Sequence, residues 1–335
     1  MPARGLEFER IARMVSGLAV TRKRGAMAFD PNPYFRKLIL VATHNPLVAK
    51  LVNTYGMRLG ASRFVAGESF EECAPKLKEL NRQGFKCNTT ILGEAITDRA
   101  LANQVTDDYI AILDQIERDG IRCNLAVKLT QMGLNIDEEL AYANIERLAA
   151  HAKTKNNFVR IDMEDSPLVD VTLRIYKRLR DAGHDNVGTV LQSYLYRTGK
   201  DYEGLIPYHP NLRIVKGAYL EPPSVAYPKK ADVDARYLIL TKDMLANNVY
   251  TGIATHDTRI IDAVIDYTNR MGIGRDKFEF QMLYGIATNL QKDLVARGYT
   301  VLIATPHGPQ WYFYLMRRLA ERPANVLFFL KNLLK

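Results

Sequence analysis

Past about residue 86 the chain alternates between short apolar runs and longer amphipathic stretches, and this alternation constrains the fold most. The short runs are rich in β-branched residues and nearly continuous in apolar character, as strands covered on both faces must be. Eight runs are predicted strands: 86–92, 124–130, 158–163, 187–193, 212–216, 250–255, 278–283 and 299–304. Helical spacing predicts helices between them: 98–119, 138–152, 168–182, 232–248 and 259–271.

Strands that alternate with helices indicate a parallel sheet with right-handed crossovers. Eight such units favour an α/β fold of the closed (βα)8, TIM-like type over an open doubly wound sheet. The chain also has no Gly-x-Gly-x-x-Gly turn after its first predicted strand, which argues against a dinucleotide-binding sheet. Before the barrel, helices are predicted over 34–41, 46–55 and 70–83. We therefore expect a flexible basic extension (1–29), an N-terminal helical arm (30–85) and a barrel domain (86–335).

The charge of the chain is unusual, whereas its overall composition is ordinary. With 47% apolar and 25% charged residues, the 335-residue chain is typical of a globular protein, and its three cysteines are too few for a secreted disulfide framework. The net charge is +9, and the first 50 residues hold nine Lys or Arg against three Asp or Glu. A basic arm of this kind attracts phosphates or anionic lipid. No zinc-finger, helix-turn-helix or RNA-recognition signature is present, so we do not expect nucleic-acid binding.

Polar side chains close nearly every predicted strand. Because the chemistry of such barrels lies at the carboxyl ends of the strands, these residues indicate a site there. Each would carry a desolvation cost inside the barrel unless it had a partner. The residues are Glu94, Lys128, Asp162, Glu164, Asp165, Gln192, Lys216, Thr255, His256 and Asp257.

The two strand-end lysines allow more than one interpretation. Lys128 and Asp162 fit a buried ion pair that only holds neighbouring strands in register. Lys216 fits a Schiff-base nucleophile, as in lysine-dependent aldolases, or an anion contact. Gly217, directly after it, permits the close backbone approach that a phosphate-bearing cofactor needs.

His256 beside Asp257 raises the question of a metal site. Only six histidines are present, and no second histidine closes a predicted strand apart from His307. Metal centres of this type usually recruit several His, Cys or carboxylate ligands. We therefore expect no metal.

The last predicted helix carries a different signal. Tyr314, Arg317, Arg318 and Glu321 follow the spacing i, i+3, i+4 and i+7, which places them on one helical face. Two guanidinium groups beside a tyrosine can bind a carboxylate in a bidentate manner. A solvated face in which Glu321 pairs with both arginines is the alternative.

These motifs resemble the proline dehydrogenase family, in particular its monofunctional bacterial members, from about residue 33 to 335. The resemblance rests on their number and order more than on any single motif. The motifs are RFVAGE (63–68), LGEA (92–95), VKLT (127–130), RIDME (160–164), VLQSY (190–194), RIVKGAY (213–219), ATH (254–256), EFQMLYG (279–285) and the Tyr-x-x-Arg-Arg-x-x-Glu helix (314–321).

The resemblance implies a distorted barrel that binds FAD non-covalently and oxidises L-proline to Δ1-pyrroline-5-carboxylate. A hydride would pass from proline C5 to flavin N5 in this first step of proline catabolism. The implied substrate contacts are Lys128, supported by Asp162, with Arg317, Arg318, Tyr314 and Leu283. The implied cofactor contacts are Met163, Gln192, Arg213, Lys216, Gly217, Ala218, Thr255 and His256, with Arg213 close to N5. Glu94 and Arg317 would form a gating ion pair.

One position departs from the family pattern. The family has a tyrosine two residues before the proline of its Pro-x-Gly turn, where this chain has Ala304. In the family that tyrosine packs over the far edge of the proline ring, and hydroxyproline-oxidising relatives carry a smaller residue. A larger pocket would favour hydroxyproline or another cyclic imino acid as substrate. Alternatively, His307 or a shifted helix refills the space.

Two other classes of protein also fit parts of the pattern: a lysine-dependent barrel aldolase that uses Lys128 or Lys216, and a flavin-binding protein that has lost turnover. For the favoured dehydrogenase, the resemblance implies a quinone as electron acceptor and a partner dehydrogenase for pyrroline-5-carboxylate. We expect a cytoplasmic protein with peripheral contact to the inner face of the membrane, made through the basic arm.

Overall fold

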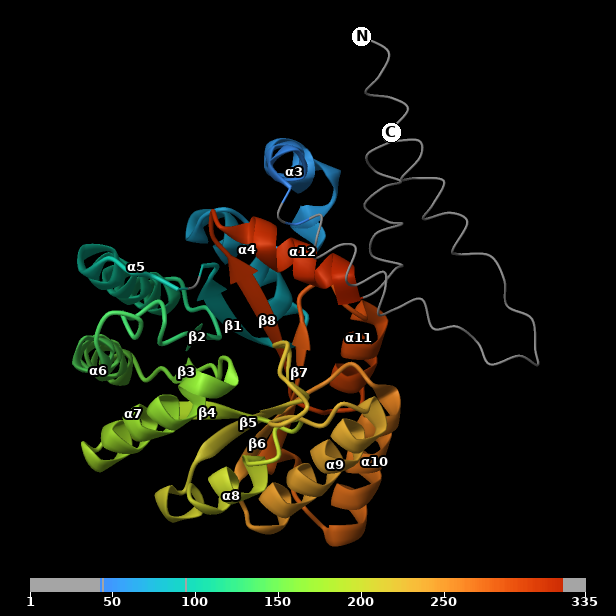
Figure 1. Cartoon of the computed structure of the whole chain (residues 1–335). Coiled ribbons are helices and arrows are strands. Elements are labelled where there is room, and N and C mark those ends of the chain that lie inside the picture. The colour runs from blue at the N-terminus through green and yellow to red at the C-terminus, as the bar shows by residue number, and fades with distance from the viewer. Residues whose placement is uncertain (1–42, 44, 94, 322–335) are drawn as a thin grey trace. The chain divides into compact units, whose positions relative to one another are not determined.

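The computed structural model of the chain describes residues 43, 45–93 and 95–321. In this part of the chain, eight parallel strands form a closed barrel in sequential order, with helices around it (Figure 1). The predicted barrel is thus confirmed. The strands are β1 (Lys86–Ile91), β2 (Cys123–Val127), β3 (Val159–Ile161), β4 (Val187–Gln192), β5 (Asn211–Val215), β6 (Tyr250–Ala254), β7 (Phe278–Leu283) and β8 (Val301–His307).

All the helices predicted between strands are present, with boundaries within two residues of the expected ones. The described helices are α3 (Pro46–Leu59), α4 (Phe70–Arg82), α5 (Arg99–Arg118), α6 (Glu138–Thr154), α7 (Val169–Asp181), α8 (Thr198–Glu203), α9 (Lys230–Ala246), α10 (Thr258–Met271), α11 (Thr288–Ala296) and α12 (Trp311–Glu321). The short helices α8 and α11 were not predicted, because six and nine residues are too few for a clear 3.6-residue period.

Side-chain caps explain where several helices begin. Ser69 accepts a hydrogen bond from the backbone N–H of Glu72 at the start of α4, and Asp98 accepts one from Leu101 at the start of α5. Asp257 caps α10 in the same way. Such caps satisfy N–H groups that have no partner within the helix, so they place each helix start directly after its strand or loop.

Strand β8 closes the barrel and runs three residues past its predicted end. Pro306 pairs with Thr90 and His307 pairs with Ile91, both on β1. Proline has no N–H to donate, which is why the sequence pattern favoured an end before it. The ladder continues because the carbonyl of His307 accepts from the N–H of Leu92 at 2.6 Å.

The described chain forms two compact units, residues 1–65 with 310–335 and residues 66–309. The second unit holds the whole barrel and α4, and the first holds α3 and α12. The expected extension (1–29) and the helix predicted over 34–41 lie outside the described residues. The division into segments 1–29, 30–85 and 86–335 that we expected from the sequence stays a prediction. In the described part of the chain, every helix is too short or too polar to span a membrane.

The main core lies between the strands and the helices that surround them. Helix α5 shows how the sequence builds it, since Tyr109, Leu113 and Ile116 recur at helical spacing and are buried. Tyr109 also places its hydroxyl against the N–H of Ile91 at 3.0 Å, so the end of β1 is tied to this helix. Burial of such large side chains is the main source of folding free energy.

A buried histidine joins α4 to the barrel wall. The Nδ1 atom of His307 lies 2.8 Å from the hydroxyl of Thr89, which donates its own proton to the carbonyl of Thr305. The ring also lies 5.5 Å from that of Phe70 on α4. His307 therefore packs between β1, β8 and α4. Burial lowers the pKa of His307 from 6.5 to about 4.

This pKa predicts an acid-sensitive contact. The unfolded chain binds a proton at His307 below about pH 6.5 while the folded chain does not, so unfolding is favoured as the pH falls from there towards about 4. The loss is on the order of 3 kcal/mol. The variant His307→Asn keeps a donor near Thr89 and should flatten the acid side of the stability profile. Urea denaturation across this pH range measures it. The exposed His209, changed to Asn, is the control. If the free energy of unfolding changed with pH equally in the unaltered chain and in both variants, the assignment would be contradicted.

Candidate functional site at the carboxyl end of the barrel

An ion pair between two strands lies at the centre of the site. Asp162 directly follows β3, and its Oδ1 atom accepts from Nη1 of Arg213 on β5 at 2.7 Å. Only 11% of the Arg213 side chain is exposed, against 26% for Asp162. Two predicted site residues are thus brought together across β4. A buried guanidinium held by a carboxylate keeps its direction and its charge.

The residues around this pair also follow the strands. Lys128 directly follows β2, and the backbone N–H of Asp162 donates to the carbonyl of Val127 at 2.8 Å. This bond brings the ends of β2 and β3 into register, so Lys128 and Asp162 leave neighbouring strands at the same end of the barrel. Met163 comes next in the chain and is buried.

Gln192 closes β4 and is also buried. Its Nε2 atom donates to the carbonyl of Glu164 at 2.8 Å. The Glu164 carboxylate in turn accepts from the N–H and the hydroxyl of Thr130, at 3.2 and 2.7 Å. This network ties the ends of β2, β3 and β4 together. It fixes which way the Gln192 amide points, because Nε2 is the end that donates.

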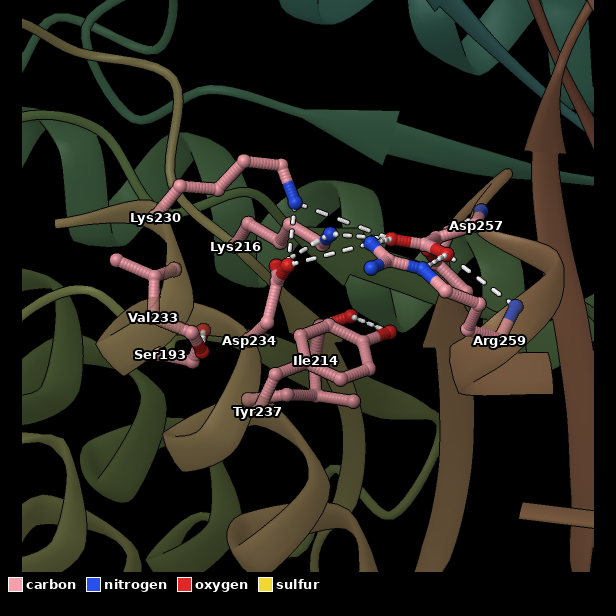
Figure 2. Close-up of polar contacts among 10 residues, drawn as sticks. Ser193, Ile214, Lys216, Lys230, Val233, Asp234, Tyr237, Asp257 and Arg259 are labelled. Atoms are coloured by element: carbon pink, nitrogen blue, oxygen red, sulfur yellow. Dashed lines mark hydrogen bonds and ion pairs between the residues drawn. The ribbon is translucent and has the colours of Figure 1, made fainter. Parts of the chain in front are cut away.

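A second charged group lies at the ends of β5 and β6 (Figure 2). Lys216 follows β5, and its Nζ atom lies 2.5 Å from Asp234 on α9 and 3.3 Å from Asp257 at the start of α10. Lys230 and Arg259 contact the same two carboxylates. Three cations therefore surround two carboxylates.

Both carboxylates are held in the ionised form. Hydrogen bonds from Arg259 lower the pKa of Asp257 furthest, and Lys216 adds to the effect. Burial raises the pKa of Asp234, but hydrogen bonds from Lys216 and Lys230 bring it below its ordinary value. The group thus keeps a net positive charge and lies beside the N-termini of two helices, where an anion is stabilised by the helix dipole.

Gly217, directly after Lys216, lies in close contact with the ring of Tyr194. Its φ is +121°, and a Cβ atom at this position would lie 2.3 Å from the ring of Tyr194. The backbone N–H of Tyr194 donates to the carbonyl of Lys216 at 2.9 Å, so the two segments run in close contact. Only glycine fits here, and Ala218 beyond it is exposed. The glycine therefore lets the backbone pass directly against the ring of Tyr194.

The end of β6 faces the end of β7. The hydroxyl of Thr255 accepts from the N–H of Asp257 at 3.1 Å, and Nε2 of His256 accepts from the N–H of Leu283 at 3.0 Å. A neutral His256 therefore carries its proton on Nδ1. Because Nε2 is already used, this histidine is poorly suited to ligate a metal through that atom.

Ala304 lies on the inward side of β8, where it pairs with Leu283 on β7 and Asn88 on β1. It is partly exposed. His307 lies on the opposite face of β8 against Thr89 and α4, so it does not refill the place beside Ala304. Glu94 lies outside the described residues.

The remaining predicted residues, Tyr314, Arg317 and Arg318, are on α12. All three are partly exposed, and the guanidinium of Arg318 lies 5.2 Å from the centre of the Tyr314 ring. They therefore share one helical face, as their spacing predicts. This helix belongs to the other compact unit, residues 310–335 with 1–65.

Sequence reasoning missed three members of the charged group around Lys216. Lys230, Asp234 and Arg259 lie near the starts of helices and close no strand, so the search at strand ends passed over them. The signal that could have found them is the spacing of Lys230 and Asp234, which are four residues apart on one helical face.

The arrangement suits a ligand with an anionic part and an electron-accepting part. The group around Lys216, with its net positive charge beside two helix N-termini, fits a phosphate-bearing chain. Arg213 offers a fixed cation deeper in the barrel, where charge that develops on a bound group is stabilised. Lys128 directly follows β2 at the same end of the barrel and is partly exposed.

Comparison with known proteins identifies the relatives of the chain. A family model described as proline dehydrogenase matches residues 73–330. The proline dehydrogenase of Deinococcus radiodurans is 44% identical over 305 residues, which cover 90% of this chain and 98% of that protein. Proline dehydrogenase 1 of Bacillus subtilis is 40% identical over 300 residues, covering 90% and 99%.

Solved structures support the fold. Proline utilization A from Bdellovibrio bacteriovorus, inactivated by N-propargylglycine, superimposes with a TM-score of 0.77 at 24% identity. The match covers 87% of this chain and 37% of that one. The same barrel architecture is thus present in a much longer protein.

The close approach of Gly217 to Tyr194 leads to a prediction about stability. Gly217→Ala adds both a strained φ and a collision with Tyr194, and should lower the free energy of unfolding by about 2–3 kcal/mol. Gly183→Ala is the matched control, since φ is +84° there and no described atom lies within 4 Å of the added Cβ. It should cost only about 1 kcal/mol. Urea denaturation compares them, and equal losses would contradict the close approach.

Proposed function

The chain belongs to the proline dehydrogenase family, and on that premise we propose that it oxidises L-proline to Δ1-pyrroline-5-carboxylate with non-covalently bound FAD. It is an oxidoreductase that acts on the CH–NH group of a small imino acid. The observation that carries the proposal is the partly buried Asp162–Arg213 pair at the carboxyl end of a barrel that matches this family over residues 73–330.

The residues present fit FAD. The cations around Lys216 suit its pyrophosphate, and the fixed Arg213 suits the flavin ring. Bound FAD would supply the hydride acceptor: the proline C5–H bond breaks with its electron pair, the nitrogen lone pair forms the C=N bond, and the N–H proton leaves to solvent.

The chain's own residues divide into those that hold the cofactor and those that hold the substrate. We assign the flavin to Arg213, Gln192 and the backbone of Met163. We assign the rest of FAD to Lys216, Gly217, Ala218, Thr255 and His256. Asp162 keeps the guanidinium of Arg213 in one orientation, so that its charge favours the reduced cofactor without rearrangement.

The substrate carboxylate is assigned to Lys128, Arg317 and Arg318, with Leu283 and Tyr314 as the walls for the ring. Cations on the carboxylate turn C5 towards the cofactor, and such positioning supplies much of the rate enhancement. A gating ion pair between Glu94 and Arg317 belongs to the same proposal. It would close the entrance when no substrate is bound.

The electrons would pass to a quinone, and the product would pass to a partner dehydrogenase for pyrroline-5-carboxylate. We place the protein in the cytoplasm with peripheral contact to the membrane, where quinone is dissolved. The nine basic residues among the first 50 suit anionic lipid.

Contacts at Lys216 speak against an aldolase that uses this lysine. Its Nζ atom lies within 3.3 Å of two carboxylates, which are contacts of an ammonium group. A Schiff-base lysine needs a neutral amine that can attack a carbonyl.

The proposed function is tested by spectroscopy of the purified chain. We expect bound flavin, released on denaturation, and loss of its oxidised absorption on addition of L-proline in the absence of oxygen. A dye acceptor, then a quinone analogue with and without acidic vesicles, measures turnover. A colourless protein that traps substrate at a lysine with borohydride would support the aldolase instead. Flavin that no imino acid bleaches would indicate a protein without turnover.

Ala304 favours a second substrate. It pairs with Leu283 and Asn88 and is partly exposed, and His307 points away from it, so His307 does not fill the place where the family tyrosine would stand. A ring hydroxyl on the substrate fits such a space. We therefore propose that the site accepts trans-4-hydroxy-L-proline better than family members with the tyrosine do.

The variant Ala304→Tyr tests this pocket. It should improve kcat/KM for L-proline over trans-4-hydroxy-L-proline by about 10- to 100-fold, because a missing or added contact in a pocket is worth about 1–3 kcal/mol. Steady-state rates with both substrates measure the ratio. Ala304→Val is the control, because it fills part of the same space without adding an aromatic ring. An unchanged ratio in Ala304→Tyr would show that this position does not face the substrate ring.

A further inference from the structure

A chain of hydrogen bonds runs from Arg213 through the inside of the barrel. Nε of Arg213 donates to Oε1 of Gln281 on β7, and Nε2 of Gln281 donates to Oε1 of Glu279 at 2.8 Å. The other oxygen of Glu279 accepts from the hydroxyl of Tyr250 at 2.9 Å and lies 3.8 Å from Nζ of Lys86. Gln281 and Glu279 are only 4% and 5% exposed, so the connection is buried until it reaches Lys86.

The orientation of the Gln281 amide is fixed by its two neighbours. An arginine only donates hydrogen bonds and an ionised carboxylate only accepts them. The amide oxygen must therefore face Arg213 and the amide nitrogen must face Glu279. Burial, together with the charge of Glu279, raises the pKa of Tyr250, so its hydroxyl stays protonated and donates.

A glycine on the strand between them makes this connection fit. Gly252 on β6 pairs with Arg213 on one side and with Glu279 on the other. A Cβ atom at Gly252 would lie 2.4 Å from Nε2 of Gln281. Any larger residue would stand between β5 and β7 and would force the Gln281 amide away from its place.

We propose that Gln281, backed by Glu279 and given room by Gly252, is a positioning residue that fixes the guanidinium of Arg213 for the cofactor. Asp162 holds Nη1 and Gln281 holds Nε, so two contacts from different strands define the plane of the group. The two N–H groups of Nη2 and the second N–H of Nη1 are used by neither contact, and these would face the flavin. The inference rests on the proposed function only for its effect on the cofactor.

The geometry is tested in Gln281→Leu, which keeps the volume and removes both hydrogen bonds. In the full chain as purified, we expect the Nε–H of Arg213 to exchange with solvent about tenfold faster or more, measured by nitrogen-15 NMR of labelled arginine. The signal is assigned by its loss in Arg213→Lys. Gly252→Ala should produce the same change without altering any polar group. Unchanged exchange in both variants would overturn the proposal, whatever the cofactor proves to be.

The effect on the cofactor is a separate measurement. Gln281→Leu should lower the flavin midpoint potential and reduce kcat/KM for L-proline by about 10- to 100-fold, because a misplaced group can cost that much. The shift in potential should largely disappear when the same change is made in Arg213→Lys. An equal shift in both backgrounds would show that Gln281 does not act through Arg213.

A matched control separates positioning from stability. Asn144 is a buried amide on α6 that donates to the carbonyl of Met132 at 3.0 Å. It takes no part in the hydrogen bonds that run from Arg213 to Glu279. Asn144→Leu should lower the melting temperature and leave the potential unchanged. A shift in potential as large as that in Gln281→Leu would reduce the role of Gln281 to stability alone. Wild-type protein without flavin would instead refute the proposed function, while the exchange experiment would still decide the geometry.

Discussion

A closed barrel has an interior without bulk water, so a charge placed inside must find its partner on another strand. Arg160 on β3 shows the cost, since burial lowers its pKa to about 9 even though three oxygen atoms accept from its guanidinium. Arg213 meets the same constraint with Asp162 and Gln281. The placement of the partners of Arg160 and Arg213 follows from this need, because a partner lost inside the barrel cannot be replaced by solvent.

Glycines on intervening strands let the partners reach one another. Gly188 on β4 leaves the space that Arg160 fills, and a Cβ atom there would lie 2.6 Å from its Nη1. Gly252 does the same for Gln281. In a barrel packed only with Val, Leu and Ile, side chains from alternate strands would fill these layers and separate the charges. The two glycines thus permit a polar interior in a fold whose interior is usually apolar.

Periodicity was enough to predict the barrel, because each strand is covered on both faces and each helix has an apolar side. It predicted β7 to the residue and placed Asp162, Gln192 and Lys216 at strand ends. It could not give the partners. The support of Lys128 by Asp162 stays a prediction, and the ion pair of Asp162 with Arg213, two strands away, was not foreseen. Such a contact depends on barrel closure and strand tilt, which no local pattern encodes. For the same reason, the sequence alone assigned no role to Asp234 or Gln281.

The contacts of Lys216 differ from those of Arg213 in how exposed the neighbouring charged groups are. Its ammonium lies between Asp234 and Asp257, and both carboxylates also hold cations that are largely exposed, Lys230 and Arg259. An arriving phosphate can therefore take Lys216 as a partner while Lys230 and Arg259 continue to neutralise the carboxylates. Neither carboxylate is then left buried and unpaired, which is the state that costs most. Deeper in the barrel, Arg213 has no such exposed substitutes, and this is why its contacts must be fixed by the fold.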